Sequence, residues 1–383
     1  MIDRILEQRL TQELQSSQKI IILYGSRQVG KTTLINKVLR QLNKKTLFVN
    51  ADSGEYVDIL SSRDSLRLKR LIGDHNLLFI DEAQRIPDIG INLKIIHDQK
   101  KELRVIVSGS SSLDLANRIV EPLTGRTWTY TLFPVSLEEW RRFRKYPTYL
   151  LDSQLEELLL FGNYPEAITI AGKDRKIQYL NELRRAYLYK DILALANIRY
   201  PEKLDQLVQL LAYQVGQLVS IQELANNLQV SRETVSNYID LLEKGFVVFK
   251  LPGYSGNLRK EITKMSKIYF YDLWVRNAVV NNFSPLNLRN DTGALWENFL
   301  IAERKKWLAY NFSYANTYFW RTHTGAEIDY LEEKDGRLHG YEFKWNTKKY
   351  RSRYAPWEQA YPNGTFECIT PEQIGDWLLN TET

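Results

Sequence analysis

Short apolar runs alternate with amphipathic stretches through the first third of the chain. The runs are bounded by polar turns, which is typical of strands buried on both faces. The stretches between them repeat apolar residues with the period of a helix. This alternation predicts an α/β fold in which helices cover both faces of a parallel sheet. The expected strands are Ile20–Tyr24, Thr46–Asn50, Leu77–Ile80, Arg104–Ser108 and Trp128–Phe133.

The pattern changes after this region and becomes mostly helical until Pro201, which interrupts a helical period. Three short helices and a β ribbon are expected next, followed by an α+β segment rich in tryptophan and tyrosine. We therefore predict a sheet domain, a helical lid, a small domain of helices and ribbon, and an α+β domain. Their expected bounds are residues 1–135, 136–200, 201–275 and 276–383.

The turn between the first strand and the next helix is rich in glycine. It consists of Gly25, Ser26, Arg27, Gln28, Val29, Gly30, Lys31, Thr32 and Thr33. Such a turn directs backbone N–H groups toward one point, and the helix N-terminus adds partial positive charge there. Lys31 can neutralise β- and γ-phosphates, and the Thr32 hydroxyl can hold Mg²⁺. The turn therefore predicts a binding site for ATP with Mg²⁺.

The third expected strand ends in two carboxylates, Asp81 and Glu82. Ligands bind beyond the carboxyl ends of strands in open parallel sheets. We expect Asp81 to hold the Mg²⁺ with its water shell. Glu82 is then placed to polarise an attacking water. Because both carboxylates are present, the sequence predicts hydrolysis as well as nucleotide binding.

The fourth expected strand ends in hydroxyl groups. Ser110 is the first candidate to sense the γ-phosphate or to orient water, and Ser108 is the second. An alternative remains open, since Ser111 or Ser112 can cap the N-terminus of the next helix. The two roles do not exclude each other.

The order of these motifs, with an arginine before the last strand, resembles the AAA+ superfamily. In that superfamily the arginine before the last strand often reaches the nucleotide of a neighbouring subunit. Arg126 stands at this position, and Arg118 competes with it. The resemblance implies an active site between subunits of a homo-oligomer, such as a hexamer. A local surface salt bridge is the alternative role for Arg126, and Arg184 and Arg185 are candidates for a second sensor.

Three segments are similar to a prokaryotic AAA+ family of predicted ATPases that carry a C-terminal domain of unknown function. These segments are Gly25–Leu34, Leu78–Gln84 and Gly125–Pro134. Ser26 departs from that family, which usually has proline there, but the loop needs backbone donors more than this side chain. Phe161–Glu166 resembles the Gly-x-x-Pro turn in the lid of related signalling ATPases.

Residues 205–250 predict a winged helix-turn-helix. Ser220 and Glu223 form an expected capping box at its second helix. A recognition helix needs small polar or basic side chains at its exposed first turns. These side chains are Arg232, Ser236 and Asn237 in the third helix. We expect them to contact DNA, although winged helices also serve as protein contacts or packing spacers.

A hairpin turn in the last hundred residues joins a strand with Asp329 to a strand with Glu342 and Lys344. Strand alternation places Glu342 and Lys344 on one face. These residues resemble the Asp followed by Glu-x-Lys of the restriction-endonuclease-like fold, with Glu297 as the helix acid. The resemblance implies a second Mg²⁺ site for phosphodiester cleavage, although structural descendants without catalysis exist. A charged solvent face of a hairpin is the alternative.

Composition limits the remaining choices. The 383 residues include one cysteine, Cys368, which excludes internal disulfides and cysteine-based zinc sites. The net charge of +6 permits an anionic partner such as DNA. No apolar run approaches the roughly 18 residues that cross a bilayer, and Met1–Arg4 lacks a signal-peptide core. We expect a cytoplasmic protein without a membrane partner.

Together these features predict an oligomeric AAA+ ATPase that binds DNA and remodels it or moves along it. Two alternatives stay open. One is a nucleotide-gated, Mg²⁺-dependent nuclease, for example in defence. The other is an ATP-driven signalling switch that binds a protein partner.

Overall fold

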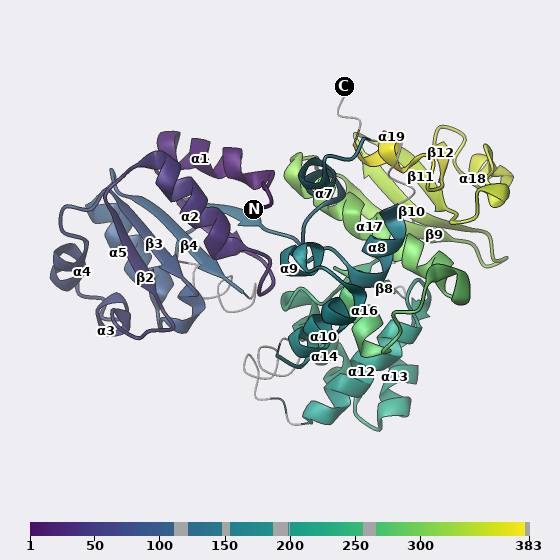
Figure 1. The fold of residues 1–383 in the computed structure, drawn as a ribbon, viewed down its shortest axis with the longest axis horizontal. Helices are drawn as coiled ribbons and strands as arrows, with labels where there is room; N and C mark the ends of the chain where they lie inside the picture. Colours follow the sequence, from purple (N-terminus) through teal and green to yellow (C-terminus); the bar gives the residue numbers. More distant parts are fainter. Residues whose placement is uncertain (111–121, 148–153, 187–197, 199, 256–265, 380–383) are drawn as a thin grey trace. The chain divides into compact units, whose positions relative to one another are not determined.

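The computed structural model describes residues 1–110, 122–147, 154–186, 198, 200–255 and 266–379. The chain divides into two compact units (Figure 1). The first consists of Met1, Asp3–Phe133 and Lys244–Phe246. The second contains Ile2, Pro134–Glu243 and Val247–Thr383.

A parallel sheet forms the centre of the first unit. Its strands are β1 (Ile20–Tyr24), β2 (Thr46–Asn50), β3 (Leu77–Asp81), β4 (Arg104–Gly109) and β5 (Thr127–Thr131). Their order is β2-β3-β4-β1-β5, and all neighbours are parallel. The predicted parallel sheet is therefore confirmed. Since β4 lies between β1 and β3, the three strands that precede the predicted site motifs end beside one another.

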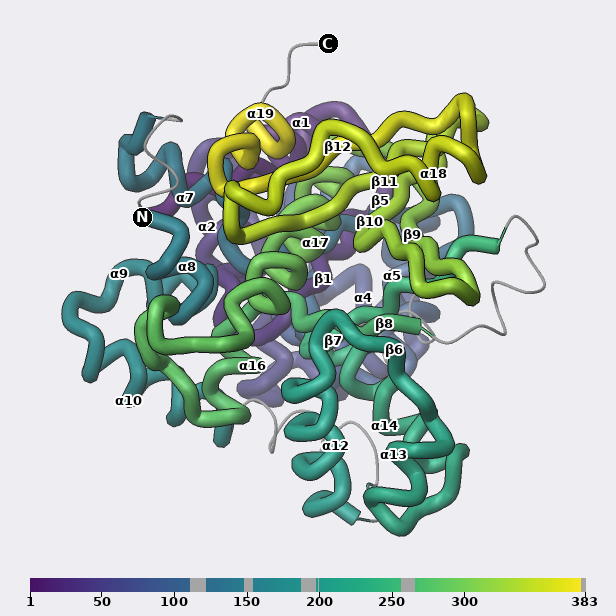
Figure 2. The backbone as a smooth tube through the Cα atoms, turned by 90° about the vertical axis from the view of Figure 1, so that its right-hand side faces the viewer, coloured from purple at the N-terminus to yellow at the C-terminus, as the bar shows by residue number. Residues whose placement is uncertain are grey.

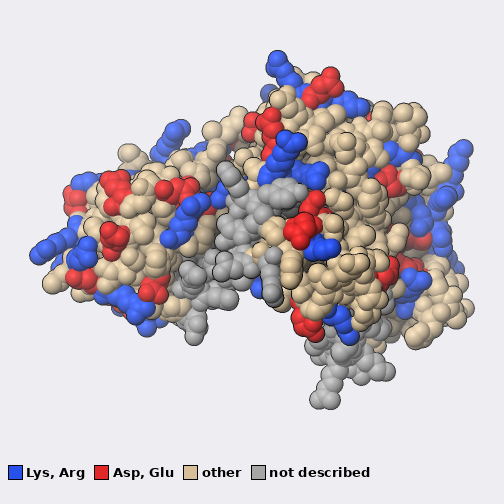
Figure 3. Space-filling model, turned by 90° about the horizontal axis from the view of Figure 1, so that it is seen from below, with Lys and Arg blue, Asp and Glu red and all other residues tan. Residues whose placement is uncertain are grey.

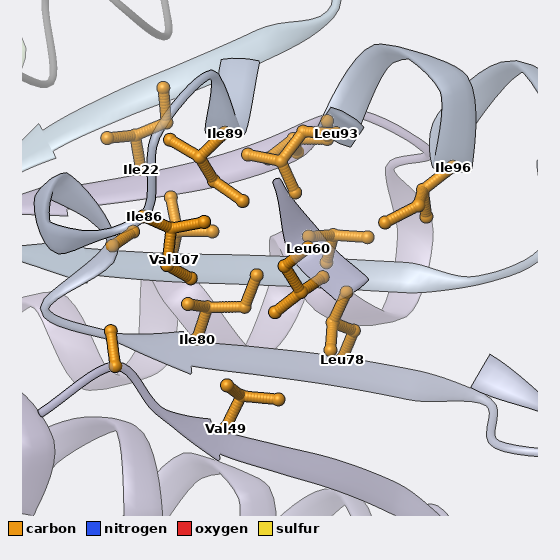
Figure 4. Packing of buried hydrophobic residues seen from close by; sticks show 14 of the residues in the cluster. Ile22, Val49, Leu60, Leu78, Ile80, Ile86, Ile89, Leu93, Ile96 and Val107 are labelled. Atoms are coloured by element: carbon orange, nitrogen blue, oxygen red, sulfur yellow. The ribbon is translucent and has the colours of Figure 1, made fainter. Parts of the chain in front are cut away.

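Helices cover this sheet on both faces, and alternate strand residues point to each. The helices are α1 (Leu6–Ser16), α2 (Lys31–Leu42), α3 (Val57–Leu60), α4 (Ser65–Ile72) and α5 (Ile89–Gln99), with a 3₁₀ turn at Ala83–Arg85. Figure 4 shows Ile22, Ile80 and Val107, from three strands, packed near Ile89 and Leu93 of α5. The continuous burial of β1 and β3 explains their unbroken apolar sequences.

Helices predominate at the start of the second unit. They are α7 (Leu137–Arg144), α8 (Leu155–Phe161), α9 (Pro165–Thr169) and α10 (Lys173–Arg184). Ser136 begins α7 with a reciprocal capping box, because its hydroxyl accepts from Glu139 N and the Glu139 carboxylate accepts from Ser136 N.

Three helices and a three-stranded antiparallel sheet follow. The elements are α12 (Pro201–Tyr213), β6 (Leu218–Val219), α13 (Ile221–Leu228), α14 (Arg232–Lys244), β7 (Val248–Leu251) and β8 (Ser266–Phe270). The strand order is β6-β8-β7. The Ser220 hydroxyl accepts from Glu223 N at 3.3 Å, which is the half of the expected capping box that caps α13.

A four-stranded mixed sheet occupies the C-terminal part of the second unit. Its elements are α16 (Leu273–Val279), α17 (Thr292–Tyr310), β9 (Asn316–Arg321), β10 (Glu327–Lys334), β11 (Arg337–Phe343), α18 (Ala355–Ala360), β12 (Thr365–Ile369) and α19 (Ile374–Leu378), with 3₁₀ turns at Leu286–Leu288 and Thr347–Lys349. The order is β12-β11-β10-β9, in which only β11 and β12 are parallel. Helix α17 lies beside β10 and β11 (Figure 2). The predicted α+β architecture is therefore confirmed.

Buried amide side chains join the parts of the second unit. Asn298 of α17 accepts from Phe270 N and donates to Phe270 O, both at 2.8 Å, so it completes the backbone bonding of β8. Asn277 donates to Leu159 O and Leu160 O, at 2.9 and 3.0 Å, at the end of α8. Because these contacts are buried and specific, the segments predicted as separate domains pack as one unit.

The turn at Phe161–Glu166 also has a packing role in this unit. Gly162 has a φ of +70°, and a Cβ there would lie 1.8 Å from Asp272 Oδ1. Asn163 N donates to the other oxygen of Asp272 at 2.9 Å. The requirement for glycine at this turn is therefore explained by the close approach of a buried carboxylate.

Candidate functional site

The glycine-rich turn after β1 has the geometry of a phosphate cradle. A Cβ at Gly25 would lie 2.3 Å from Leu132 O, so this position must lack a side chain. Gly30 has a φ of +95°, a conformation that glycine adopts without strain, and immediately precedes α2. The turn and the first turn of α2 thus lie at the carboxyl end of β1, as predicted. Ser26 is buried in this turn.

The Lys31 side chain is buried within the turn. Its Nζ donates to Gly25 O at 2.8 Å and to Ser26 O at 2.9 Å. Both acceptors are carbonyls of the turn itself, so the ammonium group lies where the sequence predicts the phosphates. A cation among backbone dipoles at a helix N-terminus favours an anionic ligand.

Asp81, the last residue of β3, connects the neighbouring strand ends. Its Oδ2 accepts from Thr32 Oγ1 at 2.7 Å, and its Oδ1 accepts from Ser108 Oγ of β4. A hydroxyl and a carboxylate side by side are the oxygen ligands that Mg²⁺ uses with a nucleotide. Thr32 and Asp81 therefore fit the predicted Mg²⁺ role. Ser108, our second choice as a γ-phosphate sensor, holds Asp81 in the structure.

Glu82 follows with a left-handed backbone, at a φ of +54°. Non-glycine residues in this conformation often occur at functional sites. Its Oε2 accepts from Ser110 Oγ at 3.1 Å, and Gln84 Nε2 donates to the same serine oxygen at 3.1 Å. The structure therefore brings Glu82 and Ser110 together. Sequence reasoning missed Gln84, and its only signal was proximity to Glu82. The alternative caps, Ser111 and Ser112, lie outside the described residues.

Arg126 lies at the opposite end of the sheet from the cradle. It precedes β5, whose Thr127 pairs with Ile20 at the start of β1. Its guanidinium binds Asp98, with 3.0 Å from Nε to Oδ1 and 3.3 Å from Nη2 to Oδ2. This hydrogen bond is the main reason that the pKa of Asp98 is lowered. Arg126 is therefore not part of its own chain's cradle, and the local ion pair that was the alternative is present.

The other candidate arginines are placed differently. Arg118 lies outside the described residues. Arg184 donates to Ala278 O at 3.0 Å and lies 3.4 Å from Asp205, both within the second unit. Arg185 is exposed on the same unit.

Arg4 contacts the cradle and was missed by sequence reasoning. Its buried guanidinium donates from Nη1 to Val29 O at 2.7 Å and from Nη2 to Phe133 O at 2.5 Å. Leu132 N donates to Tyr24 O at 2.7 Å beside it. The Arg4 side chain thus joins the glycine-rich turn to the segment that follows β5. Only the close approach of distant segments reveals this, so no local signal could have found it.

The predicted DNA-contacting residues lie on the exposed side of α14. Arg232, Ser236 and Asn237 are exposed, while Val235 and Ile239 are buried on the other side of the helix. Basic and acidic side chains are interspersed on the face drawn in Figure 3. Surface charge on that face therefore does not mark a nucleic-acid site, and the argument for α14 depends on its exposed polar side chains.

The carboxylates expected at the C-terminal site are bound by protein cations. Glu342 Oε1 lies 2.7 Å from Lys344 Nζ, and Glu342 Oε2 lies 3.2 Å from Arg351 Nε. Glu297 Oε1 lies 3.1 Å from Lys267 Nζ. Asp329 Oδ2 accepts from Phe343 N at 2.8 Å.

These contacts bear on the predicted second metal site. Among the described residues, no three His, Cys, Asp or Glu side chains are grouped so as to hold a metal ion. Sequence reasoning missed Lys267, which comes from β8 and neutralises the acidic group. Burial, together with the neighbouring Glu297, raises the pKa of Asp329 to about 7, although Lys267 and Lys344 act to lower it. Ammonium groups bind one oxygen of Glu297 and one of Glu342, and a backbone N–H binds Asp329.

None of the helices in the described part of the chain combines the length and the apolar character needed to span a membrane.

Three family models match the chain in succession. A model described as an AAA domain matches residues 17–141, which include the glycine-rich turn, Asp81 and Glu82. Domains of unknown function match residues 152–286 (DUF8612) and 292–362 (DUF4143).

A relative that aligns over most of the chain shows the family. The chain is 30% identical to the uncharacterized protein Rv2008c of Mycobacterium tuberculosis, over 85% of this chain and 70% of that protein. The chain belongs to the AAA+ ATPases. The uncharacterized protein MJ1544 of Methanocaldococcus jannaschii is a further relative of this ATPase, with 24% identity over 82% of this chain and 72% of that protein.

A solved structure agrees with this assignment at the level of the fold. The Walker-type ATPase PABY2304 of Pyrococcus abyssi has a TM-score of 0.53 and 14% sequence identity. The match covers 73% of this AAA+ ATPase and 96% of the other chain. The likeness shows a shared fold.

Proposed function

We propose that this AAA+ ATPase binds ATP with Mg²⁺, hydrolyses it, and uses the cycle to remodel DNA or to move along it as an oligomer. The observation that carries the proposal is the contact between Thr32 and Asp81 beside the glycine-rich turn. It places a hydroxyl and a carboxylate next to a buried lysine, and this combination suits a metal-bound triphosphate.

Each residue of the cradle has a role that follows from its position. Lys31 would exchange its two carbonyl acceptors for phosphate oxygens, and backbone N–H groups of residues 25–33 would hold the phosphates. Thr32 and Asp81 would hold the metal ion, with Ser108 fixing the rotation of the carboxylate. Bound ATP and Mg²⁺ would supply the phosphoanhydride bond and the positive charge over its leaving oxygens.

Glu82 would act on water at this site. A carboxylate within hydrogen-bond reach of a bound water can orient it and accept its proton. Ser110 bonds to Glu82 at 3.1 Å, which supports a role in orienting that carboxylate. This pairing gives Ser110 a positioning role rather than a separate catalytic one.

Arg126 would act on the nucleotide of a neighbouring subunit. Arg126 lies beside the start of β1, whereas the cradle of its own chain follows the end of β1. This location supports an action in trans, because the side chain does not reach the nucleotide site of its own chain. On assembly, Arg126 would release Asp98 and bind a phosphate of the neighbouring subunit's nucleotide, since both partners are anionic. An arginine finger stabilises charge on the transferred phosphoryl group.

Helix α14 would contact DNA through Arg232, Ser236 and Asn237. These side chains lie at the N-terminal half of an exposed helix that follows the order of a winged helix. Phosphate contacts would add affinity at the helix N-terminus, and the polar side chains would reach base edges or sugars.

The test measures ATP hydrolysis and DNA binding together. ATPase rates would be compared with and without duplex, forked and four-way DNA, and mobility shifts recorded at about 50 mM and 200 mM salt. We expect DNA to raise the rate and salt to weaken binding. Arg232→Ala with Asn237→Ala should reduce binding, while Arg353→Ala, an equal charge change at an exposed site, should not.

Absence of binding to every DNA form at low salt, with ATP hydrolysis intact, would contradict the DNA part of the proposal. A partner protein bound by the second unit would then be the better explanation. Absence of ATP hydrolysis in every assembly state would contradict the enzymatic part.

A further inference from the structure

One buried lysine lies among the acidic residues of the C-terminal sheet. Lys267 Nζ is 3.1 Å from Glu297 Oε1 and 2.5 Å from Glu327 Oε1. Its side chain is only 2% exposed. The three residues come from β8, α17 and β10, so an element outside the mixed sheet supplies the cation.

The remaining donors to these carboxylates also come from the protein. Tyr269, two residues along β8, donates its hydroxyl to Glu297 Oε1 at 2.5 Å. Glu342 is bound by Lys344 and Arg351, and Asp329 accepts from a backbone N–H. A metal ion would have to displace these donors to reach the oxygens they bind. Glu342 Oε2 accepts no hydrogen bond from the described residues, and Arg351 lies beside it as an ion-pair partner.

Lys267 is held where it is by its strand. Residue 267 lies in β8, the central strand of its sheet, and pairs with Leu218 on one side and Leu251 on the other. Its ammonium also lies 5.5 Å from the centre of the Phe319 ring. Since the backbone is fixed on both sides and the side chain is buried, moving the ammonium out of the acidic group would require opening the fold.

Access to Glu297 is also restricted from another direction. Gly216, between α12 and β6, has a φ of +77°, and a Cβ there would lie 3.2 Å from Glu297 Oε1. Backbone therefore packs directly against the carboxylate that the nuclease signature assigns to the helix. A metal ion with its waters, as Mg²⁺ prefers, needs more room than this contact leaves.

We infer that Lys267 is a built-in cation that takes the place of a divalent ion, so that the C-terminal domain holds no catalytic metal and does not cleave phosphodiester bonds. The ammonium supplies the positive charge that the carboxylates need, but it has no vacant coordination position to activate water or polarise phosphate. The acidic group thereby becomes a structural connection between β8 and the mixed sheet. The pattern of these residues implies metal-dependent cleavage, but the cation bound to their carboxylates does not fit that chemistry.

Manganese binding in the absence of nucleotide tests this inference, because Mn²⁺ can be followed by electron paramagnetic resonance. Lys267→Met keeps an apolar stem of similar length and removes the charge. We expect the variant to bind Mn²⁺ at least about tenfold more tightly than the wild type, a difference of about 1.4 kcal/mol. The gain should disappear when Asp329→Asn is added.

Lys250→Met is the matched control. Lys250 lies on β7 of the same sheet and also binds two carboxylates, those of Asp240 and Glu243, but it is partly exposed. We expect this variant to bind Mn²⁺ like the wild type. Circular dichroism would establish that each variant is folded. A folded Lys267→Met chain that gains no Mn²⁺ affinity would overturn the inference.

A second measurement uses chains with Lys267 intact. The wild type should not cut plasmid DNA with Mg²⁺ or Mn²⁺, and Asp329→Asn should leave its Mn²⁺ binding unchanged. Metal-dependent cutting that is lost in Asp329→Asn or Lys344→Ala would overturn the inference even if Lys267→Met failed to fold. Neither result depends on the ATPase cycle, so failure of the proposed function would remain distinguishable.

Discussion

The chain contains two groups of carboxylates and lysines near strand ends, and they differ in what donates to the carboxylates. In the first unit, both oxygens of Asp81 accept from hydroxyls, those of Thr32 and Ser108. In the second unit, Glu297 and Glu342 are each bound by an ammonium group. The same residue types thus form two groups, one in which hydroxyls bind the carboxylate and one in which ammonium groups neutralise the carboxylates.

The difference has a direct consequence for ligand binding. A hydroxyl leaves the charge of a carboxylate in place and can itself become a metal ligand. An ammonium group cancels that charge and offers no lone pair. The neighbours of a carboxylate, rather than the carboxylate itself, therefore determine whether it is available to a metal ion.

Replacement of Lys31 should have the largest effect on the first group. Lys31→Ala removes the cation at the centre of the cradle, so we expect ATP binding to be lost, as measured by calorimetry. Lys37→Ala is the control, because Lys37 is on the same helix but binds Asp3 and Glu7 at the surface. Unchanged ATP hydrolysis in Lys31→Ala would contradict the assignment of the cradle.

Replacement of Glu82 should separate binding from chemistry. Glu82→Gln keeps the shape of the side chain but removes its basicity, so ATP should remain bound while the hydrolysis rate falls by about 10²–10⁴-fold. Glu102→Gln, at an exposed position, serves as the control. A wild-type turnover number in Glu82→Gln would remove this residue from the catalytic role.

Replacement of Arg126 should test whether the site is shared between subunits. Loss of one preorganised donor predicts a fall of about 10²-fold in the turnover number of Arg126→Ala. Mixing this variant with Lys31→Ala should restore part of the activity, because one chain supplies the cradle and the other the arginine. If the mixture is no more active than either variant, Arg126 does not act in trans.

Replacement of Arg4 should have a smaller effect on the cradle. Arg4→Lys keeps the charge but cannot bridge Val29 O and Phe133 O with one planar group. Loss of one such hydrogen bond predicts ATP affinity about tenfold weaker, measured by calorimetry. Arg9→Lys, in the helix α1 that follows Arg4 and paired with Glu13, should bind ATP normally. Normal affinity in Arg4→Lys would show that the cradle does not depend on this bridge.

Replacement of a third carboxylate, Asp272, should have the smallest effect, and this effect concerns the pH dependence of stability. Burial raises its pKa to about 6, although Lys306 lowers it and backbone N–H groups of Asn163 and Trp274 also stabilise the charged form. A raised pKa means that the folded state holds a proton more tightly than the unfolded state, whose value is 3.8. This contribution to stability is present below about pH 4 and is lost as the pH rises through about 6.

Asp272→Asn provides the measurement of that contribution. The amide cannot ionise, so the melting temperature of the variant minus that of the wild type should rise by a few degrees between about pH 4 and pH 7. A difference that does not change with pH would mean that Asp272 has an ordinary pKa in the folded protein.

The sequence predicted the local parts of this molecule well. The pattern located the five strands of the first sheet to within about two residues. The signal was strongest for β1, β3 and β4, because strands buried on both faces are apolar throughout, whereas β2 and β5 are partly exposed edge strands. Gly25, Gly30 and Lys31 were identified because a phosphate cradle needs these residues at fixed spacing, and Asp81 because it ends an apolar strand. In the C-terminal region, the Asp335-Gly336 turn was recognised from its own composition.

The tertiary structure decided which distant residues meet. Whether Ser108 or Ser110 bonds to Asp81 depends on the pairing of β3 with β4, and Arg4 reaches Val29 only in the folded unit. Lys267 lies in a strand whose sequence does not reveal that α17 and β10 will surround it. Periodicity along a chain indicates which face of an element is buried, but not which element packs there. For this reason the sequence determined the phosphate cradle, while only the packing of β8 decided that Lys267 would join the second acidic group.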